Sequence, residues 1–193
     1  MAVDLSEVSK ERCRITGSPQ PLMGILGMDC LRHYCIQLDF ATQKVRFLDP
    51  DHVSKDNLGE AFPLTISLCA FVHDTLMGIK ADSLIDTGCN FDGDLTPKLF
   101  KQWTNQVGTG PSALPPAAHF PNGMFGGQMY TNLYVYGGGG GNSIGLSFLA
   151  RHLVTLNFPR RVMYLQCRNI GPLSETNDFF TGFYTNKFEF EKN

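Results

Sequence analysis

The stretch Ser83-Leu84-Ile85-Asp86-Thr87-Gly88 decides the fold of this chain. An apolar run leads directly into Asp86, and a polar segment, residues 89–94, follows it. A carboxylate at the point where a buried strand breaks into a turn is held rigidly and is partly shielded from water. Asp86 is therefore a candidate for acid–base catalysis. The alternative is an Asp that only starts a turn, because Asp and Gly are common turn residues.

The composition limits the possible classes of protein. The chain has 193 residues, of which 42% are hydrophobic, so it can bury a core. Its 20 glycines, 15 phenylalanines and charged fraction of 18% are typical of a strand-rich fold with tight turns. The near balance of 16 basic and 18 acidic residues gives no indication of a nucleic-acid partner. No apolar run is long enough to span a membrane.

Neither the cysteines nor the N-terminal segment indicates a metal site or an export signal. The six cysteines follow no metal-binding or disulfide spacing, so we expect free thiols, no bound metal and no cofactor. Residues 1–20 are mixed and charged, without the apolar centre of a signal peptide. The sequence therefore assigns no compartment.

Hydrophobic patterning predicts several strands and two short helices. One helix is expected at residues 28–34, and another begins at Thr96-Pro97, where Thr can cap the first turn and Pro fits the first helical position. A turn is expected at residues 73–74 and a long loop at residues 108–127. The predicted strands are residues 35–40, 45–48, 62–72, 77–85 and 128–136.

Residues 26–40 and 144–158 form an internal repeat with a constant offset of 118. Gly27 aligns with Gly145, and eight apolar positions of the first stretch fall on apolar positions of the second. The repeated unit contains a strand, a short helix and two further strands. At this offset the equivalent of Asp86 falls before Met1. We therefore expect the chain to hold one complete unit and the last part of a preceding one.

With these motifs the chain resembles the lobes of aspartic proteases, which occur singly in retropepsins and in pairs in pepsins. The resemblance covers about residues 20–166 and is closest to bacterial two-lobed retropepsin-like proteins. It rests on the Asp-Thr-Gly stretch and on two closing motifs, Gly24-Ile25-Leu26-Gly27-Met28-Asp29 and Ser143-Ile144-Gly145-Leu146-Ser147-Phe148-Leu149. It implies a mainly β fold of the acid protease barrel type, with one complete lobe and the C-terminal part of a preceding lobe.

The resemblance also implies a division of the chain into three segments. Residues 1–60 would be the C-terminal part of a first lobe and a linker. Residues 61–167 would be the second lobe, which carries the Asp-Thr-Gly motif. Residues 168–193 would be an aromatic-rich tail.

The activity implied by the resemblance is hydrolysis of peptide bonds by a water molecule that a carboxylate activates. Two neighbouring carboxylates do not both ionise, so one takes a proton from the water and the other polarises the peptide carbonyl. Asp86 would be one of these acids, and Thr87 and Gly88 would support its loop. The closing motifs would place five further residues near the active site: Ile25, Leu26, Gly27, Ile144 and Gly145.

The second acid is missing from this sequence, because no second Asp-Thr-Gly or Asp-Ser-Gly occurs in it. The chain could pair as a homodimer, could need a first-lobe segment, or could be a non-catalytic module for peptide binding or assembly. The repeat favours the missing segment, because a self-pairing lobe needs no additional closing motif. We therefore expect an aspartic endopeptidase, acting on a peptide or protein substrate, that is inactive as this isolated chain.

Overall fold

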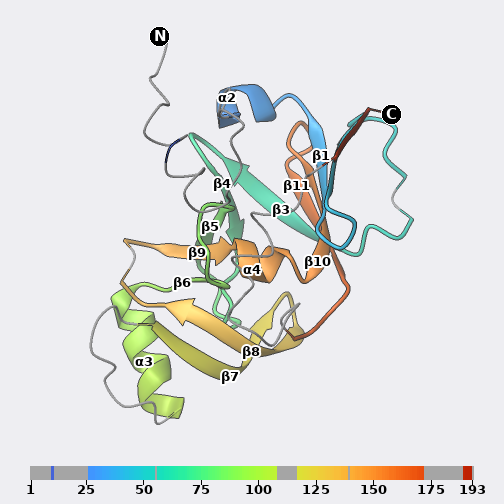
Figure 1. Cartoon of the computed structure of the whole chain (residues 1–193). Helices are drawn as coiled ribbons and strands as arrows, with labels where there is room; N and C mark the ends of the chain where they lie inside the picture. The colour runs from blue at the N-terminus through green and yellow to red at the C-terminus, as the bar shows by residue number, and fades with distance from the viewer. Residues whose placement is uncertain are drawn as a thin grey trace.

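The computed structural model describes residues 10, 26–54, 56–107, 117–138, 140–171 and 189–192, with backbone alone at 105–107 and 189–192. The fold is mainly β, as the composition and patterning predict. The strands follow one hydrogen-bonded order, β12-β2-β1-β10-β11-β3-β4-β5-β9-β6-β8-β7 (Figure 1). The elements are α2 Met28–Leu31, β1 Cys35–Asp39, β2 Lys44–Leu48, β3 Glu60–Ile66, β4 Ala70–His73, β5 Asp82–Asp86, β6 Gly93–Asp94, α3 Pro97–Val107, β7 Ala117–Phe125, β8 Gln128–Tyr136, β9 Asn142–Gly145, α4 Leu146–Leu149, β10 His152–Asn157, β11 Val162–Cys167 and β12 Glu189–Lys192.

The two repeat units meet in the antiparallel pair of β1 and β10. In this pair Gln37 lies opposite Thr155, which is also its equivalent at the 118-residue offset. The two units are therefore related by an approximate two-fold axis that passes between these two residues. Gln37 Nε2 donates a hydrogen bond of 3.0 Å to Thr155 Oγ1 at this axis. β2 and β11 extend the two units outward as antiparallel neighbours of β1 and β10.

The short helices α2 and α4 have the same backbone conformation at their starts. The N-cap of α2 is Gly27, with φ −85° and ψ 172°. The N-cap of α4 is Gly145, with φ −90° and ψ 174°. The repeat that the sequence indicates is therefore present in the three-dimensional structure.

The other half of the strand order builds the surroundings of the predicted acid. β9 lies between β5, to which it is parallel, and β6, to which it is antiparallel. β6 is parallel to β8, and β8 forms a long hairpin with β7. The apolar core behind these strands contains the largest fully buried hydrophobic side chains: Leu76, Leu95, Phe120, Phe125, Leu133, Ile144, Phe148, Leu149 and Met163.

The predicted strand at residues 62–72 is wrong, because these residues belong to two strands, β3 and β4, with an additional turn between them. The reversal expected around residues 73–74 does follow β4, but the next strand, predicted at 77–85, begins only at Asp82. The apolar run breaks at residues 67–69, where the Ser67 N–H donates to the Cys69 carbonyl oxygen at 2.9 Å. Leu68 is exposed at the tip of this turn. Its apolar character concealed the turn in the sequence, because an exposed leucine at a loop tip does not differ in pattern from a buried strand residue.

The predicted loop at 108–127 is also wrong where it can be tested. Residues 108–116 lie outside the described part of the chain, but residues 117–125 form β7. Pro121 is compatible with this strand because β7 is at the end of the strand order, where a missing N–H is tolerated. Across from it, Asn132 adopts a φ of 52° and interrupts the pairing between β7 and β8.

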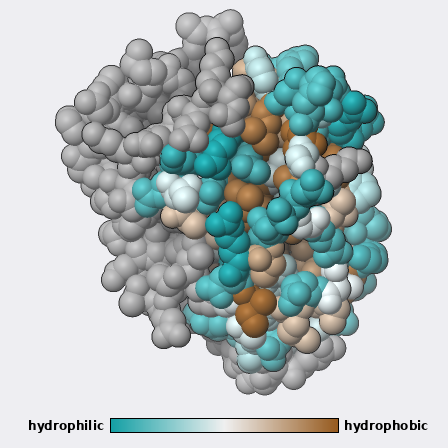
Figure 2. All heavy atoms as spheres, turned by 90° about the vertical axis from the view of Figure 1, so that its right-hand side faces the viewer, coloured by the Kyte–Doolittle hydropathy of each residue, from teal (hydrophilic) through white to brown (hydrophobic). Residues whose placement is uncertain are grey.

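Helices α2 and α3 lie at opposite ends of the molecule, with α4 between them (Figure 1). On the side shown in Figure 2, the hydrophobic side chains form small patches between hydrophilic ones. Among the described residues, no helix has the length and apolar character needed to cross a membrane.

Candidate active site

Asp86 is the last residue of β5, and its side chain is half-buried. Its neighbour across the parallel pair with β9 is Gly145. The carboxylate holds its own turn, because Oδ1 accepts the N–H of Gly88 at 2.9 Å and the Asp86 carbonyl oxygen accepts the N–H of Cys89 at 3.2 Å. Thr87 and Gly88 are exposed. The acid is thus fixed at the end of a strand, at the boundary between core and solvent.

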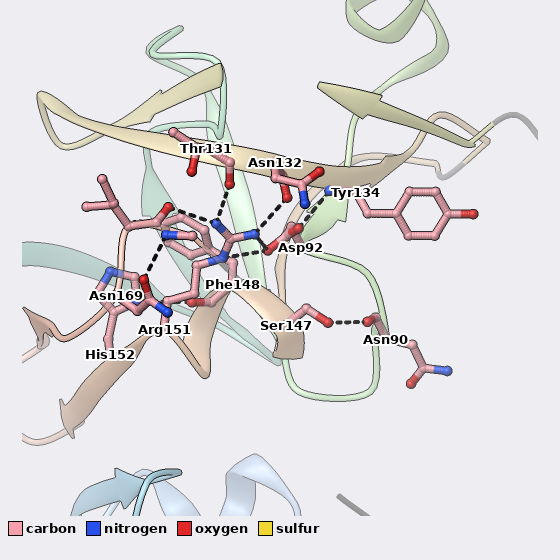
Figure 3. A network of polar contacts seen from close by, with 12 residues as sticks. Asn90, Asp92, Thr131, Asn132, Tyr134, Ser147, Phe148, Arg151, His152 and Asn169 are labelled. Carbon is pink, nitrogen blue, oxygen red and sulfur yellow. Dashed lines mark hydrogen bonds and ion pairs between the residues drawn. The ribbon is translucent and has the colours of Figure 1, made fainter. Parts of the chain in front are cut away.

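Residues 86–92, which begin with Asp86, are called the acid loop. This loop is hydrogen-bonded to the first turn of α4. Gly145 N–H donates to the Asp92 carbonyl oxygen at 2.8 Å, and Leu146 N–H donates to the Cys89 carbonyl oxygen at 2.8 Å. Ser147 donates twice, from N–H to the Phe91 carbonyl oxygen at 3.3 Å and from Oγ to the Asn90 carbonyl oxygen at 2.6 Å (Figure 3). The free N–H groups that every helix start presents are satisfied here by the acid loop.

Glycine is needed at residue 145 because the acid loop packs directly on its backbone. A Cβ atom at this position would overlap the Phe91 carbonyl oxygen and would also lie 3.0 Å from the Cys89 carbonyl oxygen. Ile144, the residue before it, is fully buried in the core. The second closing motif is therefore the surface on which the acid loop rests.

A buried ion pair holds the other end of the acid loop (Figure 3). The Arg151 side chain is buried, and its Nη2 lies 2.7 Å from Asp92 Oδ1. Burial raises the pKa of the Asp92 carboxyl, and the Arg151 guanidinium opposes this effect. Asp92 Oδ2 also accepts the Tyr134 N–H at 2.7 Å. Arg151 Nε also donates to Asp92 Oδ1 at 3.0 Å, and Nη1 and Nη2 donate to the carbonyl oxygens of Thr131, Asn132 and Ile170.

Asp94 is a second carboxylate of the site that the sequence reasoning missed. In the sheet register Asp94 lies beside Ser143 on β9, and Asp86 lies beside Gly145. Because residues 143 and 145 are two positions apart on one strand, these side chains share one face of the sheet. The Asp94 Oδ1 atom is buried and has no hydrogen-bond partner in the described part of the chain. Burial raises the pKa of Asp94, and the negative charge of Asp86 raises it further.

The thiol of Cys89 lies close to both carboxylates. Its Sγ atom is 4.0 Å from Asp94 Oδ2. Burial raises the pKa of this thiol, and the charges of Asp94 and Asp86 raise it as well. The site of this chain therefore contains two carboxyl groups on one face with a neutral thiol beside them.

The first closing motif occupies a different place. Ile25 lies outside the described residues, Leu26 is exposed, and Gly27 caps α2. No interaction among the described residues joins Leu26 or Gly27 to Asp86. Of the predicted site residues, the structure brings together Asp86, Thr87, Gly88, Ile144 and Gly145, and their catalytic roles stay predictions.

Metal ligands do not cluster in the described ranges, where no group of three or more His, Cys, Asp or Glu side chains could hold an ion.

No protein-family model matches the chain, and no curated protein matches it. Among solved structures, one similar chain is a retropepsin-like aspartic protease from Rickettsia conorii. The two chains are 16% identical with a TM-score of 0.41, over 55% of this chain and 87% of that one. The architecture of this chain is mainly β, with one large sheet.

Proposed function

We propose that this chain carries one half of the active site of an aspartic-type endopeptidase, with Asp86 as one of two catalytic acids. The observation that carries the proposal is the fixed, half-buried carboxylate at the end of β5. Its Oδ1 is held by the Gly88 N–H. Among the described residues, none donates a hydrogen bond to Oδ2, so this oxygen is free to accept one from a catalytic water.

The chemistry requires two carboxyl groups that share one proton. The ionised carboxylate takes a proton from a water molecule, whose oxygen attacks the peptide carbonyl carbon. The protonated carboxyl group donates its proton to the carbonyl oxygen. The C–N bond breaks once a proton reaches the amide nitrogen, which leaves as an amine. The titration of such a pair belongs to both groups together.

Asp94 does not fit the role of the second acid. β9 separates β5 from β6, so the strands of Asp86 and Asp94 lie roughly 10 Å apart at the usual strand spacing. A catalytic pair shares its proton over a direct contact of about 3 Å. Burial and the nearby Asp86 carboxylate raise the pKa of Asp94, which favours a neutral carboxyl group beside the proposed acid.

Self-pairing through the central strand is not supported either. β1 already occupies the edge of β10 along its length, from Cys35 opposite Asn157 to Asp39 opposite Leu153. A second copy could pair with β10 only after displacing β1. This occupied edge supports a half-site that needs a complementary segment, in preference to a homodimer of two complete sites.

The test is a cleavage assay of the full chain against a mixed peptide library between about pH 3 and 7, the range in which a shared carboxyl proton titrates. Asp86→Asn is the matched variant, and the oligomeric state is measured in the same samples. We expect a folded monomer that does not cleave. Cleavage by a dimer that is lost in Asp86→Asn would replace the half-site proposal with a self-paired enzyme.

The rival function is a non-catalytic module that binds extended peptides by strand addition. It predicts peptide binding that Asp86→Asn leaves unchanged, because strand addition uses backbone groups. The half-site proposal predicts that this variant stays folded but can no longer form an active pair. Cleavage that is gained when a second acid-bearing segment is supplied, and lost again in Asp86→Asn, would exclude the module.

A further inference from the structure

The connection between β2 and β3, residues 49–59, is fixed against the sheet near both of its ends. Near its start, Asn157 Nδ2 donates a hydrogen bond of 2.9 Å to the Pro50 carbonyl oxygen. At its end, Gly59 adopts a φ of 84°, and a Cβ atom there would overlap the Leu165 carbonyl oxygen of β11. Glycine is needed for this conformation and this close approach. The connection therefore lies along β11 and is held at two points.

A hollow of about 420 Å³ lies between this connection and β11, a volume within the usual range of small-molecule sites. Along β11, Val162 and Tyr164 alternate with two buried core residues, so their side chains face away from that core. The connection supplies the opposite side. The apolar lining of the hollow consists of Pro50, Val53, Leu58, Val162 and Tyr164.

The charged side chains of the lining are Asp51 and Arg160, and they form an ion pair between Arg160 Nη2 and Asp51 Oδ1. Both side chains are more than half exposed, so the pair lies where the hollow meets solvent. An exposed ion pair of this kind exchanges partners at little cost. The buried Asn157 fixes the backbone beneath the arginine, because its Oδ1 accepts the Arg160 N–H at 3.2 Å.

The unused hydrogen-bond donors at this opening belong to Arg160. A guanidinium group has five N–H donors, and in the described part of the chain its one bonded partner is Asp51. Arg160 therefore has donors for a second carboxylate without losing the first. A ligand cation, by contrast, would compete with Arg160 for Asp51. The charges thus favour an anionic ligand over a cationic one.

We propose that this hollow binds a small monocarboxylate with an apolar body about the size of one aromatic ring. The body packs against Val53, Val162 and the Tyr164 ring, and the carboxylate accepts N–H groups of Arg160 in the paired geometry that guanidinium and carboxylate favour. This chemistry occurs both in a free aromatic acid and in the apolar C-terminal residue of a peptide. The inference is independent of the proposed function, since it uses none of the residues of the acid loop.

The test titrates the full chain with phenylpropionate and follows the methyl resonances of Val53, Leu58 and Val162 by NMR. We expect saturable shifts of these methyl groups. Phenylpropionamide, which is neutral, and phenylpropylamine, which is cationic, should bind about fivefold or more weakly, because neither offers a carboxylate to Arg160. The peptide Ala-Ala-Phe with a free C-terminus separates the two sources of the ligand. Tighter binding of this peptide than of phenylpropionate identifies a peptide end, and weaker binding identifies a free acid.

Three variants at exposed side chains distinguish recognition of the carboxylate from unspecific apolar contact. Arg160→Gln should weaken phenylpropionate binding by about fivefold or more, because the charged donor is lost. Asp51→Asn should strengthen it by about twofold or more, because the neutral amide no longer repels the ligand or competes for Arg160. Arg161→Gln is the matched control: Arg161 is the next residue, is exposed and does not line the hollow, so binding should be unchanged.

Four outcomes would overturn the proposal. They are the absence of saturable methyl shifts, equal affinity for the acid, the amide and the amine, unchanged affinity in Arg160→Gln, and an equal loss in Arg161→Gln. Nuclear Overhauser contacts from other side chains of the ligand-free protein across the hollow would also contradict it, because the chain itself would then fill the space. The same spectra report whether each variant is folded, so a loss of binding by unfolding is recognised directly.

Discussion

The short helices of the two repeat units begin with the same backbone conformation, but one helix is built into the core and the other lies at its margin. α4 buries Phe148 and Leu149 and is covered by the acid loop, whereas α2 buries none of its residues. The cap dihedrals of the two helices nevertheless agree within a few degrees. The local sequence therefore determines the conformation of the motif, and long-range partners determine whether that motif becomes part of a site.

The largest difference between the units is at the second residue after the short helix. Arg151 in the second unit is buried in its pair with Asp92, and the equivalent residue of the first unit, at the offset of 118, is the exposed His33. Arg151→His should lower the free energy of unfolding by about 3–5 kcal/mol, because it leaves the buried Asp92 carboxylate without its partner.

The reverse exchange, His33→Arg, is the control and should change stability by less than about 0.5 kcal/mol, as for most surface substitutions. Urea unfolding at pH 7 of both variants and the parent chain measures the difference. Equal effects of the two exchanges would mean that the acid loop does not depend on the Arg151 network for its position.

The glycine pair gives the next largest effect. Gly145→Ala should destabilise the chain by about 3 kcal/mol, because its Cβ overlaps the backbone of the acid loop and neither side can move freely. Gly27→Ala should cost less than about 1 kcal/mol, the loss expected from replacing a favourable N-cap residue alone.

Both substitutions add a Cβ atom to an N-cap with the same backbone conformation. The difference between their effects on stability therefore isolates the contact with the acid loop. Thermal unfolding of the two single variants provides the comparison. If Gly27→Ala were as damaging as Gly145→Ala, residues outside the described part of the chain would have to pack on Gly27 just as the acid loop packs on Gly145.

Asp86 and Gly145 were predictable because their signals are local or repeated. A strand that runs into Asp-Thr-Gly and an apolar-apolar-Gly motif at a fixed offset can both be read without knowing any pairing. The site residues that were missed, Asp94 and Arg151, depend on register. Asp94 belongs to the site because β6 pairs with β9, and Arg151 is buried because the acid loop brings Asp92 to it. Neither pairing has a sequence pattern of its own.

A pH dependence should distinguish the two units as well. His152 is buried, its Nδ1 lies 3.0 Å from the Phe148 carbonyl oxygen, and its Nε2 lies 2.8 Å from the Tyr130 hydroxyl. A carbonyl only accepts, so Nδ1 carries the proton and Nε2 accepts from Tyr130. Burial lowers the pKa of His152 to about 4. The equivalent residue of the first unit, Tyr34, is 44% exposed.

The folded chain keeps His152 neutral, whereas the unfolded chain protonates it near pH 6.5. His152 therefore does not lower the free energy of unfolding above pH 6.5. As the pH falls from 6.5 toward 4, the free energy of unfolding decreases by about 3 kcal/mol in total. Urea unfolding at a series of pH values should show this loss in the parent chain and a smaller one in His152→Gln. Identical pH profiles of the two proteins would assign the acid sensitivity to other groups.

The smallest predicted effect concerns the contact between the units themselves. Gln37→Ala removes the hydrogen bond from Nε2 to Thr155 Oγ1 at the two-fold axis and should cost about 1 kcal/mol. Thr155→Val keeps the shape of the buried residue and removes the same bond from the other side. A double-mutant cycle between the two substitutions measures their coupling, expected at about 0.5–1 kcal/mol. A coupling near zero would mean that the backbone ladder of β1 and β10 alone holds the units together. The first unit would then keep its place whatever side chains lie at the axis, so that two units of diverging sequence could remain joined.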